Sequence, residues 1–572
     1  MCIFIFLLLL FVILEFALFG SISYAYVHKI ENIYFVSINW ENTKNLKLLI
    51  PVLFVSVFFR TFAAILFIIM RQTLLLVLSA VVWSVCSANT PSYTNPILPY
   101  DYSDPDVCRI GDTYLMTSSS FNSVPGLQIL ASKDLVHWEI ADAAIPHRLP
   151  GYKEGEKVLG RFVWAPAIRE HKGILYIFYG DPDRGIYCIR SKSSIDKNNI
   201  TFPLEWEEAV LVIAGKGYID PCPLWDDDGR VWLAHAFAGS RAGFKSVLLI
   251  AELNSDALSV KTPSRIVFDG HIEHATCEGP KLYKRNGYYY IMHPAGGVTN
   301  GWQVVQRSKS IYGPYELQVT LEQGKTDING PHQGGWVEAN DGSHWFIHFQ
   351  DKGAAGRIVH MQPIQWVNDW PVMGDNGEPM RAVEGNRDQK TILPTYANHA
   401  KRDNFDSTEL GLHWQWAGGY IDPRWHYCDV KNGYLRLYSA PANEELMPNM
   451  LLQKIPAVAF TATARVRFAP NTEEPMQGAE KAGMIVFGRQ CFTLEIPSAG
   501  EWLYLRLDMD ANQNGQFFIS TNGKTWNKTG DTFHAREGYW TGAQIGFYCT
   551  RDNRRHNDAG WMDVDWFEIK LR

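Results

Sequence analysis

One unit of 55 to 62 residues repeats five times between residues 95 and 375. Each unit contains a hairpin of aromatic and β-branched residues around a turn glycine, a pattern typical of antiparallel strands. The turn glycines are Gly111, Gly173, Gly229, Gly287 and Gly342. Four short strands cannot bury a core alone, so neighbouring units must pack against one another. The repeat therefore predicts a five-bladed β-propeller with one four-stranded sheet per blade.

The composition fits a globular protein and excludes several functional classes. The chain has 572 residues, of which 46% are hydrophobic and 20% charged, and its net charge is −7. No basic stretch is present that could follow a phosphate backbone, so we expect no nucleic-acid partner. The nine cysteines are scattered without a CxxC pair, which excludes a disulfide scaffold and a zinc site. Aromatic residues make up 13%; they fill β cores and can also stack on sugars.

The first 88 residues differ from the rest of the chain. From Met70 the sequence has a basic start, an apolar run and small residues up to Ala88, which is typical of a signal peptide. We therefore predict a signal peptide at 70–88 and an exported protein, periplasmic, extracellular or surface-anchored. Residues 1–69 are a doubtful extension or a membrane segment, and any membrane contact is expected through this segment alone. Peptides from residues 28–47 in the native protein would contradict a start at Met70.

The C-terminal part follows a different pattern. Residues 376–400 are rich in Pro, Gly, Asn and Asp and are expected to form a linker. Residues 401–572 contain alternating strands without the blade repeat, for example at 434–438, 460–466, 483–488 and 564–569. This pattern predicts a β-sandwich of the jelly-roll type. The fold class is therefore all-β, a propeller at 95–375 followed by a sandwich.

Carboxylates recur at one place in the repeat. The channel-lining strand of each blade is expected seven to ten residues before the turn glycine. These positions read Asp104-Pro105, Ala165-Pro166, Asp220-Pro221, Glu278-Gly279-Pro280 and His332-Gln333. A single Asp-Pro is usually a turn or strand cap, but repeat symmetry brings three carboxylates to one mouth, where like charges raise one another's pKa. Glycoside hydrolysis needs one protonated carboxyl and one carboxylate; the longer Glu278 suits the acid and Asp104 the base.

The same residues resemble glycoside hydrolase family 43. The motifs are Tyr-Ser-Asp-Pro-Asp-Val at 102–107, Tyr-Ile-Asp-Pro at 218–221 and Cys-Glu-Gly-Pro-Lys-Leu-Tyr at 277–283. By this resemblance Asp104 is the general base, Asp220 the pKa modulator and orienter, and Glu278 the general acid of an inverting hydrolysis. The C-terminal part resembles the concanavalin A-like domain that follows the propeller in xylosidases of the family, where it packs on the propeller.

The resemblance also assigns four substrate-binding residues. Phe121 and Trp164 match aromatic walls of the deepest subsite, although either could be a core residue. Arg357 matches an arginine that binds sugar hydroxyls, against the alternative of a surface arginine. His332 matches a channel histidine that contacts a water-coordinated calcium in some members, and a purely structural hydrogen bond is an equal alternative. We expect no required cofactor, with a structural Ca²⁺ in the channel as the one metal that the resemblance allows.

These features predict an exo-acting hydrolase that releases terminal or side-chain pentose from plant hemicellulose-type glycans. Residues 294–309 resemble members that act on α-L-arabinofuranosides and β-D-xylosides, and the sequence does not choose between the two sugars. One alternative is a non-catalytic carbohydrate-binding propeller, which has no need for three axial carboxylates. The other is a fructan-cleaving hydrolase of the related clan, but its Trp-Met-Asn-Asp-Pro and Arg-Asp-Pro motifs are replaced here by the sequences around Asp104 and Asp220.

Overall fold

The structure is a computed structural model. It describes residues 92–384 except 154–155 and 157–158, and residues 402–572 except 420, 423, 443–448, 474–478, 498–499 and 553–558. The predicted segments at 1–69 and 70–88, and residues 385–400 of the predicted linker, lie outside the described residues. All described residues belong to the second of two compact units, which covers residues 86–572. None of the helices in this described part is long and apolar enough to span a bilayer.

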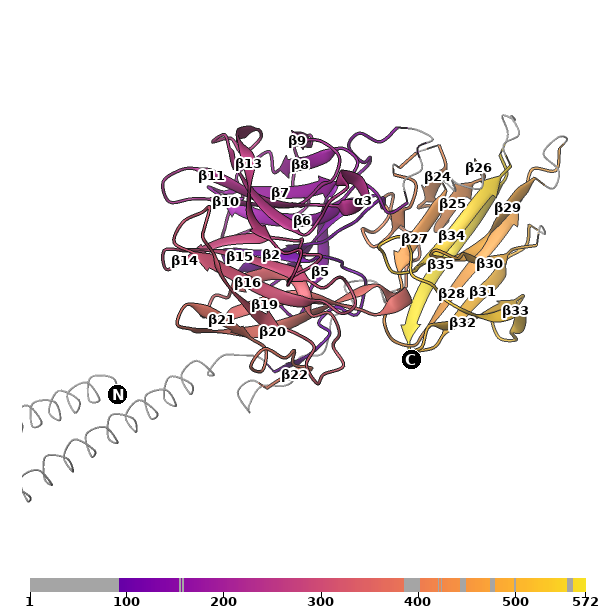
Figure 1. The fold of residues 1–572 in the computed structure, drawn as a ribbon. Helices are drawn as coiled ribbons and strands as arrows, with labels where there is room; N and C mark the ends of the chain where they lie inside the picture. Colours follow the sequence, from indigo (N-terminus) through magenta and orange to yellow (C-terminus); the bar gives the residue numbers. More distant parts are fainter. Residues whose placement is uncertain are drawn as a thin grey trace, which may run out of the picture. The chain divides into compact units, whose positions relative to one another are not determined.

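Five antiparallel sheets of four strands follow one another along the chain (Figure 1). The first two are β2 (Asp106–Ile110), β3 (Thr113–Thr117), β4 (Gly126–Ser132) and β5 (Glu139–Ile145), then β6 (Trp164–His171), β7 (Ile174–Asp181), β8 (Gly185–Arg190) and β9 (Val210–Ala214). The third is β10 (Tyr218–Trp225), β11 (Val231–Phe237), β12 (Val247–Leu253) and β13 (Val260–Asp269). The last two are β14 (Lys281–Arg285), β15 (Tyr288–Ala295), β16 (Trp302–Ser308) and β17 (Glu316–Leu321), then β18 (His332–Glu338), β19 (His344–Asp351), β20 (Arg357–Val367) and β21 (Trp370–Met373). The five predicted blades are therefore confirmed.

The turn glycines perform the predicted role. Each of the five lies between the first and second strands of its blade, with φ between 59° and 86°. This left-handed region is open to glycine without steric cost. The hairpin turns of the repeat are thus set by local sequence.

The propeller is closed by pairing between distant parts of the chain. Strand β1 (Tyr93–Thr94) pairs with β22 (Ala382–Val383), and Leu98 forms a β-bridge with Val359 in β20. A buried cluster that includes Tyr93, Trp138 and Trp345 joins the first and last blades. The start of the described chain is therefore held against the fifth blade.

Two sheets form the C-terminal β-sandwich. One has β24 (His426–Asp429), β25 (Tyr434–Tyr438), β35 (Trp561–Leu571), β28 (Phe460–Ala469), β31 (Leu503–Met509), β32 (Asn514–Ser520) and β33 (Asn527–His534) in that order. The other has β23 (Gln415–Trp416), β27 (Met450–Lys454), β34 (Gln544–Arg551), β29 (Glu480–Phe487) and β30 (Phe492–Glu495), with β26 (Ala440–Pro441) beside β34. Every second side chain of β28 is buried, as the alternating pattern predicted.

The two domains contact each other through backbone and side-chain hydrogen bonds. Val124 and Trp416 form a β-bridge, and the amide of Ala543 donates to the carbonyl oxygen of Ala354. The side-chain amide of Asn122 donates to the carbonyl oxygen of Ala417 at 3.0 Å. The sandwich therefore meets the propeller next to the first and fifth blades.

Candidate active site

A left-handed residue stands near the start of the innermost strand in each blade, either just before the strand or within its first three residues. The five residues are Asp104, Ala165, Asp220, Gly279 and Gln333, with φ between 32° and 57°. The strand register shifts next to three of them, between Trp164 and Ala167, between Ile219 and Cys222, and between His332 and Gly335. Such bulges re-aim side chains, and non-glycine residues with positive φ concentrate at functional sites.

This geometry refines the predicted equivalence of the carboxylates. Asp104 and Asp220 occupy the left-handed position itself, whereas Glu278 comes one residue before the left-handed Gly279. The true counterparts of Glu278 in the repeat are Ser103, Trp164, Ile219 and His332. The two aspartates and the glutamate thus enter the site from different backbone positions.

The three carboxyl groups interact electrostatically in the folded protein. Asp104 and Asp220 are buried, and Glu278 is partly exposed. Burial, with the negative charge of Asp104, raises the pKa of Glu278 to about 7. Burial, with the charges of Glu278 and Asp104, raises the pKa of Asp220 well above its usual range. The amide of Gly279 donates to Asp220 Oδ2 at 2.7 Å and opposes that shift. One site therefore holds carboxyl groups that do not ionise together.

Asp104 is held by two donors. Nη1 of Arg357 lies 3.1 Å from Asp104 Oδ1, and both side chains are buried. The hydroxyl of Ser119 donates to Asp104 Oδ2 at 2.5 Å and accepts a hydrogen bond from the amide of Ala165 at 2.7 Å. The guanidinium and the hydroxyl together fix the direction of both oxygens of this carboxyl group. The structure thus brings Arg357, which was predicted to bind sugar hydroxyls, into direct contact with the predicted base.

Phe121 and Trp164 lie next to this group. Their rings are 6.4 Å apart in an edge-to-face arrangement, and Phe121 forms a β-bridge with Val163. Phe121 is buried and Trp164 half-buried. The ring of Trp540, from the sandwich, lies 5.9 Å from the ring of Trp164. Trp164 is therefore an aromatic at the edge of the site.

His332 lies in the same channel. It is buried next to Phe349, and the guanidinium of Arg357 covers the same phenyl ring. Nε2 of His332 lies 2.8 Å from the carbonyl oxygen of Gly297, so this nitrogen carries the donated proton. Nδ1 is buried without a hydrogen-bond partner, and a lone pair of this kind fits a water molecule. Within the described ranges, no three His, Cys, Asp or Glu side chains could bind a metal directly; a calcium ion in this channel would contact His332 through a water ligand.

Several residues of the site were not predicted. Trp540 and Lys454 come from the sandwich, and the ammonium group of Lys454 lies 3.8 Å from the ring centroid of Tyr102. Asp101 accepts from the amides of Arg357 and Gly542, so the segment that carries the base, just before β2, is fixed to the sandwich. The sequence offers no periodic signal for these contacts. Only the proximity of Asp101 to the base motif could have suggested its role.

Comparisons with known proteins agree with this geometry. Residues 93–371 match the model of glycosyl hydrolases family 43, and residues 402–498 and 490–570 match the β-xylosidase C-terminal concanavalin A-like domain. A relative from Xylanibacter ruminicola, provisionally named a β-xylosidase, is 34% identical over 473 residues, or 80% of this chain and 86% of the relative. The chain belongs to glycosyl hydrolases family 43. This family 43 protein is therefore a glycoside hydrolase, and its substrate is an oligosaccharide or polysaccharide.

Other relatives of the family 43 enzyme carry two kinds of name. A β-xylosidase of Formosa agariphila is 28% identical over 83% of this chain and 90% of its own. A non-reducing end α-L-arabinofuranosidase of Bacteroides ovatus is 28% identical over 72% of this chain and 77% of its own. The crystal structure of a family 43 protein from Bacillus licheniformis covers 84% of this chain and 100% of its own at 23% identity, with a TM-score of 0.71. This last likeness confirms the fold, a propeller with a sandwich.

Proposed function

We propose that this enzyme releases a terminal or side-chain pentose, α-L-arabinofuranose or β-D-xylose, from plant hemicellulose-type glycans with inversion at the anomeric carbon. The observation that carries the proposal is the group of three interacting carboxyls, in which Glu278 has a pKa of about 7 and Asp104 faces Arg357. A carbohydrate-binding propeller has no use for a carboxyl that stays protonated near neutral pH. The β-xylosidase and arabinofuranosidase relatives support the choice of pentoses.

In the proposed reaction Asp104 accepts a proton from a water molecule as the water oxygen attacks the anomeric carbon. Glu278 gives its proton to the glycosidic oxygen as the bond between that oxygen and the anomeric carbon breaks. Asp220, the orienting carboxyl in this proposal, accepts a hydrogen bond from the amide of Gly279 and so fixes the backbone beside the acid. The products are a free pentose of inverted configuration and the shortened glycan or alcohol.

The remaining site residues are proposed to bind the sugar. Arg357 has further guanidinium donors beyond the one on Asp104, and these can reach sugar hydroxyls. Phe121 and Trp164 offer aromatic faces. No cofactor enters the proposed steps, because the acid and base are side chains of this chain. A water-coordinated calcium beside His332 would add positive charge in the channel. We also propose export, on the signal-peptide pattern at 70–88.

The proposal is tested by paired hydrolysis assays with 4-nitrophenyl α-L-arabinofuranoside, 4-nitrophenyl β-D-xyloside and xylobiose. We expect the wild type to hydrolyse at least one pentoside, and Asp104→Ala to lose 10³-fold or more (order of magnitude) on all substrates, because no neighbouring group replaces the base. Glu278→Ala should lose less on the nitrophenyl substrates, whose phenolate leaves without a proton, than on xylobiose. Proton NMR of the first-formed sugar should show the inverted anomer.

Two results would overturn this function. The first is wild-type rates for either carboxylate variant on xylobiose. The second is a wild type that is folded yet releases no pentose from any of the three substrates. A first-formed sugar of retained configuration would refute the inverting mechanism while leaving the pentosidase activity in place.

A further inference from the structure

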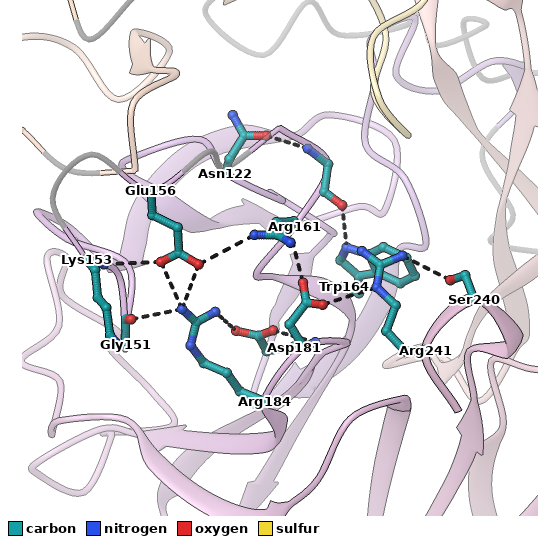
Figure 2. Close-up of polar contacts among 12 residues, drawn as sticks. Asn122, Gly151, Lys153, Glu156, Arg161, Trp164, Asp181, Arg184, Ser240 and Arg241 are labelled. Carbon is teal, nitrogen blue, oxygen red and sulfur yellow. Dashed lines mark hydrogen bonds and ion pairs between the residues drawn. The ribbon is translucent and has the colours of Figure 1, made fainter. Parts of the chain in front are cut away.

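Six charged side chains of alternating sign form a continuous series of ion pairs beside the second blade, called here the ion chain (Figure 2). Their order is Asp181, Arg184, Glu156, Arg161, Asp183 and Arg241. In each neighbouring pair, a guanidinium nitrogen lies 3.0 to 3.5 Å from a carboxylate oxygen. Three arginines face three carboxylates, so the ion chain has no net charge and every member has an oppositely charged neighbour.

The last member of the ion chain, Arg241, lies over the aromatic ring of Trp164. The guanidinium carbon of Arg241 lies 5.7 Å from the centroid of that ring, within the range of a cation–π interaction. Arg241 is on the short helix α3 (Gly239–Ala242), which follows β11 of the third blade. The contact therefore joins the third blade to the first residue of β6 in the second.

The other edges of the Trp164 ring are also held. Its indole N–H donates to the carbonyl oxygen of Gly160 at 3.1 Å, and the amide of Gly160 donates to Asn122 at 3.0 Å. Phe121 and Trp540 contact the ring edge-to-face. Figure 2 shows Trp164 between Arg241 and the backbone segment bonded to Asn122. Arg241 is the one charged group among these contacts.

The backbone next to Trp164 is held separately from its ring. The next residue, Ala165, donates its amide to the hydroxyl of Ser119, and this hydroxyl donates to Asp104. Loss of a contact on the ring would therefore shift the side chain of Trp164 and leave this amide, two hydrogen bonds from the catalytic base, in place. Partly exposed ion pairs are individually weak, but here five successive pairs restrict both the loop before β6 and helix α3.

We propose that Arg241, held by Asp183 and the ion chain behind it, is a positioning residue that fixes the Trp164 ring as a wall of the sugar-binding site. This inference rests on the proposed pentosidase function. Arg241 acts on binding of the sugar rather than on proton transfer, because its contacts lead to the aromatic wall and not to Glu278. Loss of Arg241 should therefore change KM more than kcat.

The test compares Arg241→Met with the wild type on the better of the two nitrophenyl pentosides. We expect KM to rise about three- to tenfold, the size of a partly desolvated cation–π contact, with kcat within about twofold and an unchanged pH profile. Arg241→Lys should recover most of the affinity, since an ammonium group can still pair with Asp183 and face the ring. Asp183→Asn should give an intermediate KM, because it releases Arg241 and Arg161 together.

The matched control is Arg230→Met. Arg230 also pairs with an aspartate, Asp228, and also covers a tryptophan, Trp232, with its guanidinium carbon 4.7 Å from the ring centroid. It lies at the β10–β11 turn, which is the opposite end of the third blade from the carboxylates. Arg230→Met should leave KM unchanged. A second control is Arg241→Met in a Trp164→Ala background, where the effect on KM should vanish if Arg241 acts through the ring.

Three results would overturn the proposal: an unchanged KM in Arg241→Met, an equal rise in Arg230→Met, or a full effect of Arg241→Met without the Trp164 ring. A folded wild type that hydrolyses no pentoside would refute the proposed function instead. In that case thermal unfolding of the same double-mutant cycle decides the contact. Non-additive shifts in Tm for Arg241→Met and Trp164→Ala support it, and additive shifts contradict it.

Discussion

The pKa of Glu278 is set by opposing effects on one side chain. Burial and the charge of Asp104 raise it, and the positive charges of Arg357 and Lys245 lower it. The outcome, about 7, keeps a large part of the carboxyl protonated near neutral pH, as a general acid requires. Lys245 is exposed and donates to the hydroxyl of Thr276 at 2.9 Å, so this residue can be changed without opening the site.

Replacement of Lys245 should move the alkaline limb of the pH profile. Glu278 is active when protonated, so kcat/KM should fall as pH rises through about 7. Lys245→Met removes a cation that favours the ionised form, which raises the pKa of Glu278. We expect the alkaline limb of kcat/KM, measured on xylobiose, to move to higher pH by roughly a few tenths of a pH unit.

The control for this change is Lys261→Met. Lys261 is a surface lysine in β13 that pairs with Glu252 at 2.8 Å, and its loss should leave the limb where it is. A downward shift in Lys245→Met, or equal shifts in the two variants, would show that the charge of Lys245 does not act on Glu278.

At the scale of elements, the site is assembled at the seam between blades. Asp104 precedes β2, Ser119 follows β3, and Ala165 belongs to β6. The Ser119 hydroxyl joins the other two and thereby couples the first blade to the second. Since neighbouring blades bury each other's cores, a hydrogen bond across the seam also fixes their spacing.

Removal of that hydroxyl should impair both catalysis and stability. Ser119→Ala leaves the buried amide of Ala165 without its acceptor, at a cost of about 1–3 kcal/mol, and deprives Asp104 of a donor. We expect kcat to fall roughly 10- to 100-fold for a loosened base, together with a lower midpoint of urea unfolding. Ser119→Thr keeps a hydroxyl at the same position and should retain most of both properties. Wild-type kcat in Ser119→Ala would exclude a role for this seam in placing the base.

The repeat predicted the blades because turn glycines and strand alternation are local properties of the sequence. It also brought Asp104, Asp220 and Glu278 to one mouth. The repeat could not show that Glu278 stands one residue before the left-handed position. At that position Asp104 and Asp220 are themselves left-handed, whereas in the fourth blade the left-handed residue is Gly279. The sequence alone does not tell which glycines adopt a left-handed conformation. The contacts of Ser119 and Arg357 with Asp104 join residues 15 and 253 positions away from it, and no local pattern encodes such distances.

At the scale of the whole molecule, the sandwich is part of the site's support. Asp101 accepts from Gly542, and Trp540 contacts Trp164 and lies 5.9 Å from the guanidinium carbon of Arg357. The alternating strands predicted a sandwich, since burial on one face is a local property. Which of its loops would face the propeller depends on how two complete domains pack, and this information is spread over both.

The propeller also buries a set of neutral histidines. They are His235, His293, His332, His348 and His360. Burial lowers the pKa of each, to about 4 for the first three, to about 3 for His348 and well below the usual value for His360. Four of them have a glutamine or serine of the same blade on Nε2, as in the 2.8 Å contact of His293 with Gln306 and of His235 with Ser264.

These histidines should make the enzyme less stable in mild acid. Between about pH 6.5 and 4 the unfolded chain binds protons that the native state does not, so the free energy of unfolding falls as pH falls, by about 1.4 kcal/mol per pH unit for each histidine. Burial raises the pKa of Glu278, Asp220 and Asp181, and these carboxyls act in the opposite sense. We therefore expect the free energy of unfolding to fall from pH 7 to pH 5, by less than the five buried histidines alone would cause.

One histidine can be isolated by its effect on the slope. His293→Gln changes the stability at every pH because it alters packing, but it also removes one titrating group, so the average slope of unfolding free energy between pH 7 and pH 5 should decrease by about 1 kcal/mol per pH unit. His271→Gln is the control, since His271 is exposed and pairs with Asp269 outside the core. Urea unfolding at pH 7, 6 and 5 measures the slopes. An equal slope in the wild type and His293→Gln would mean that His293 is already protonated in the native state or remains neutral in both states, and the burial of a neutral imidazole would not explain acid sensitivity.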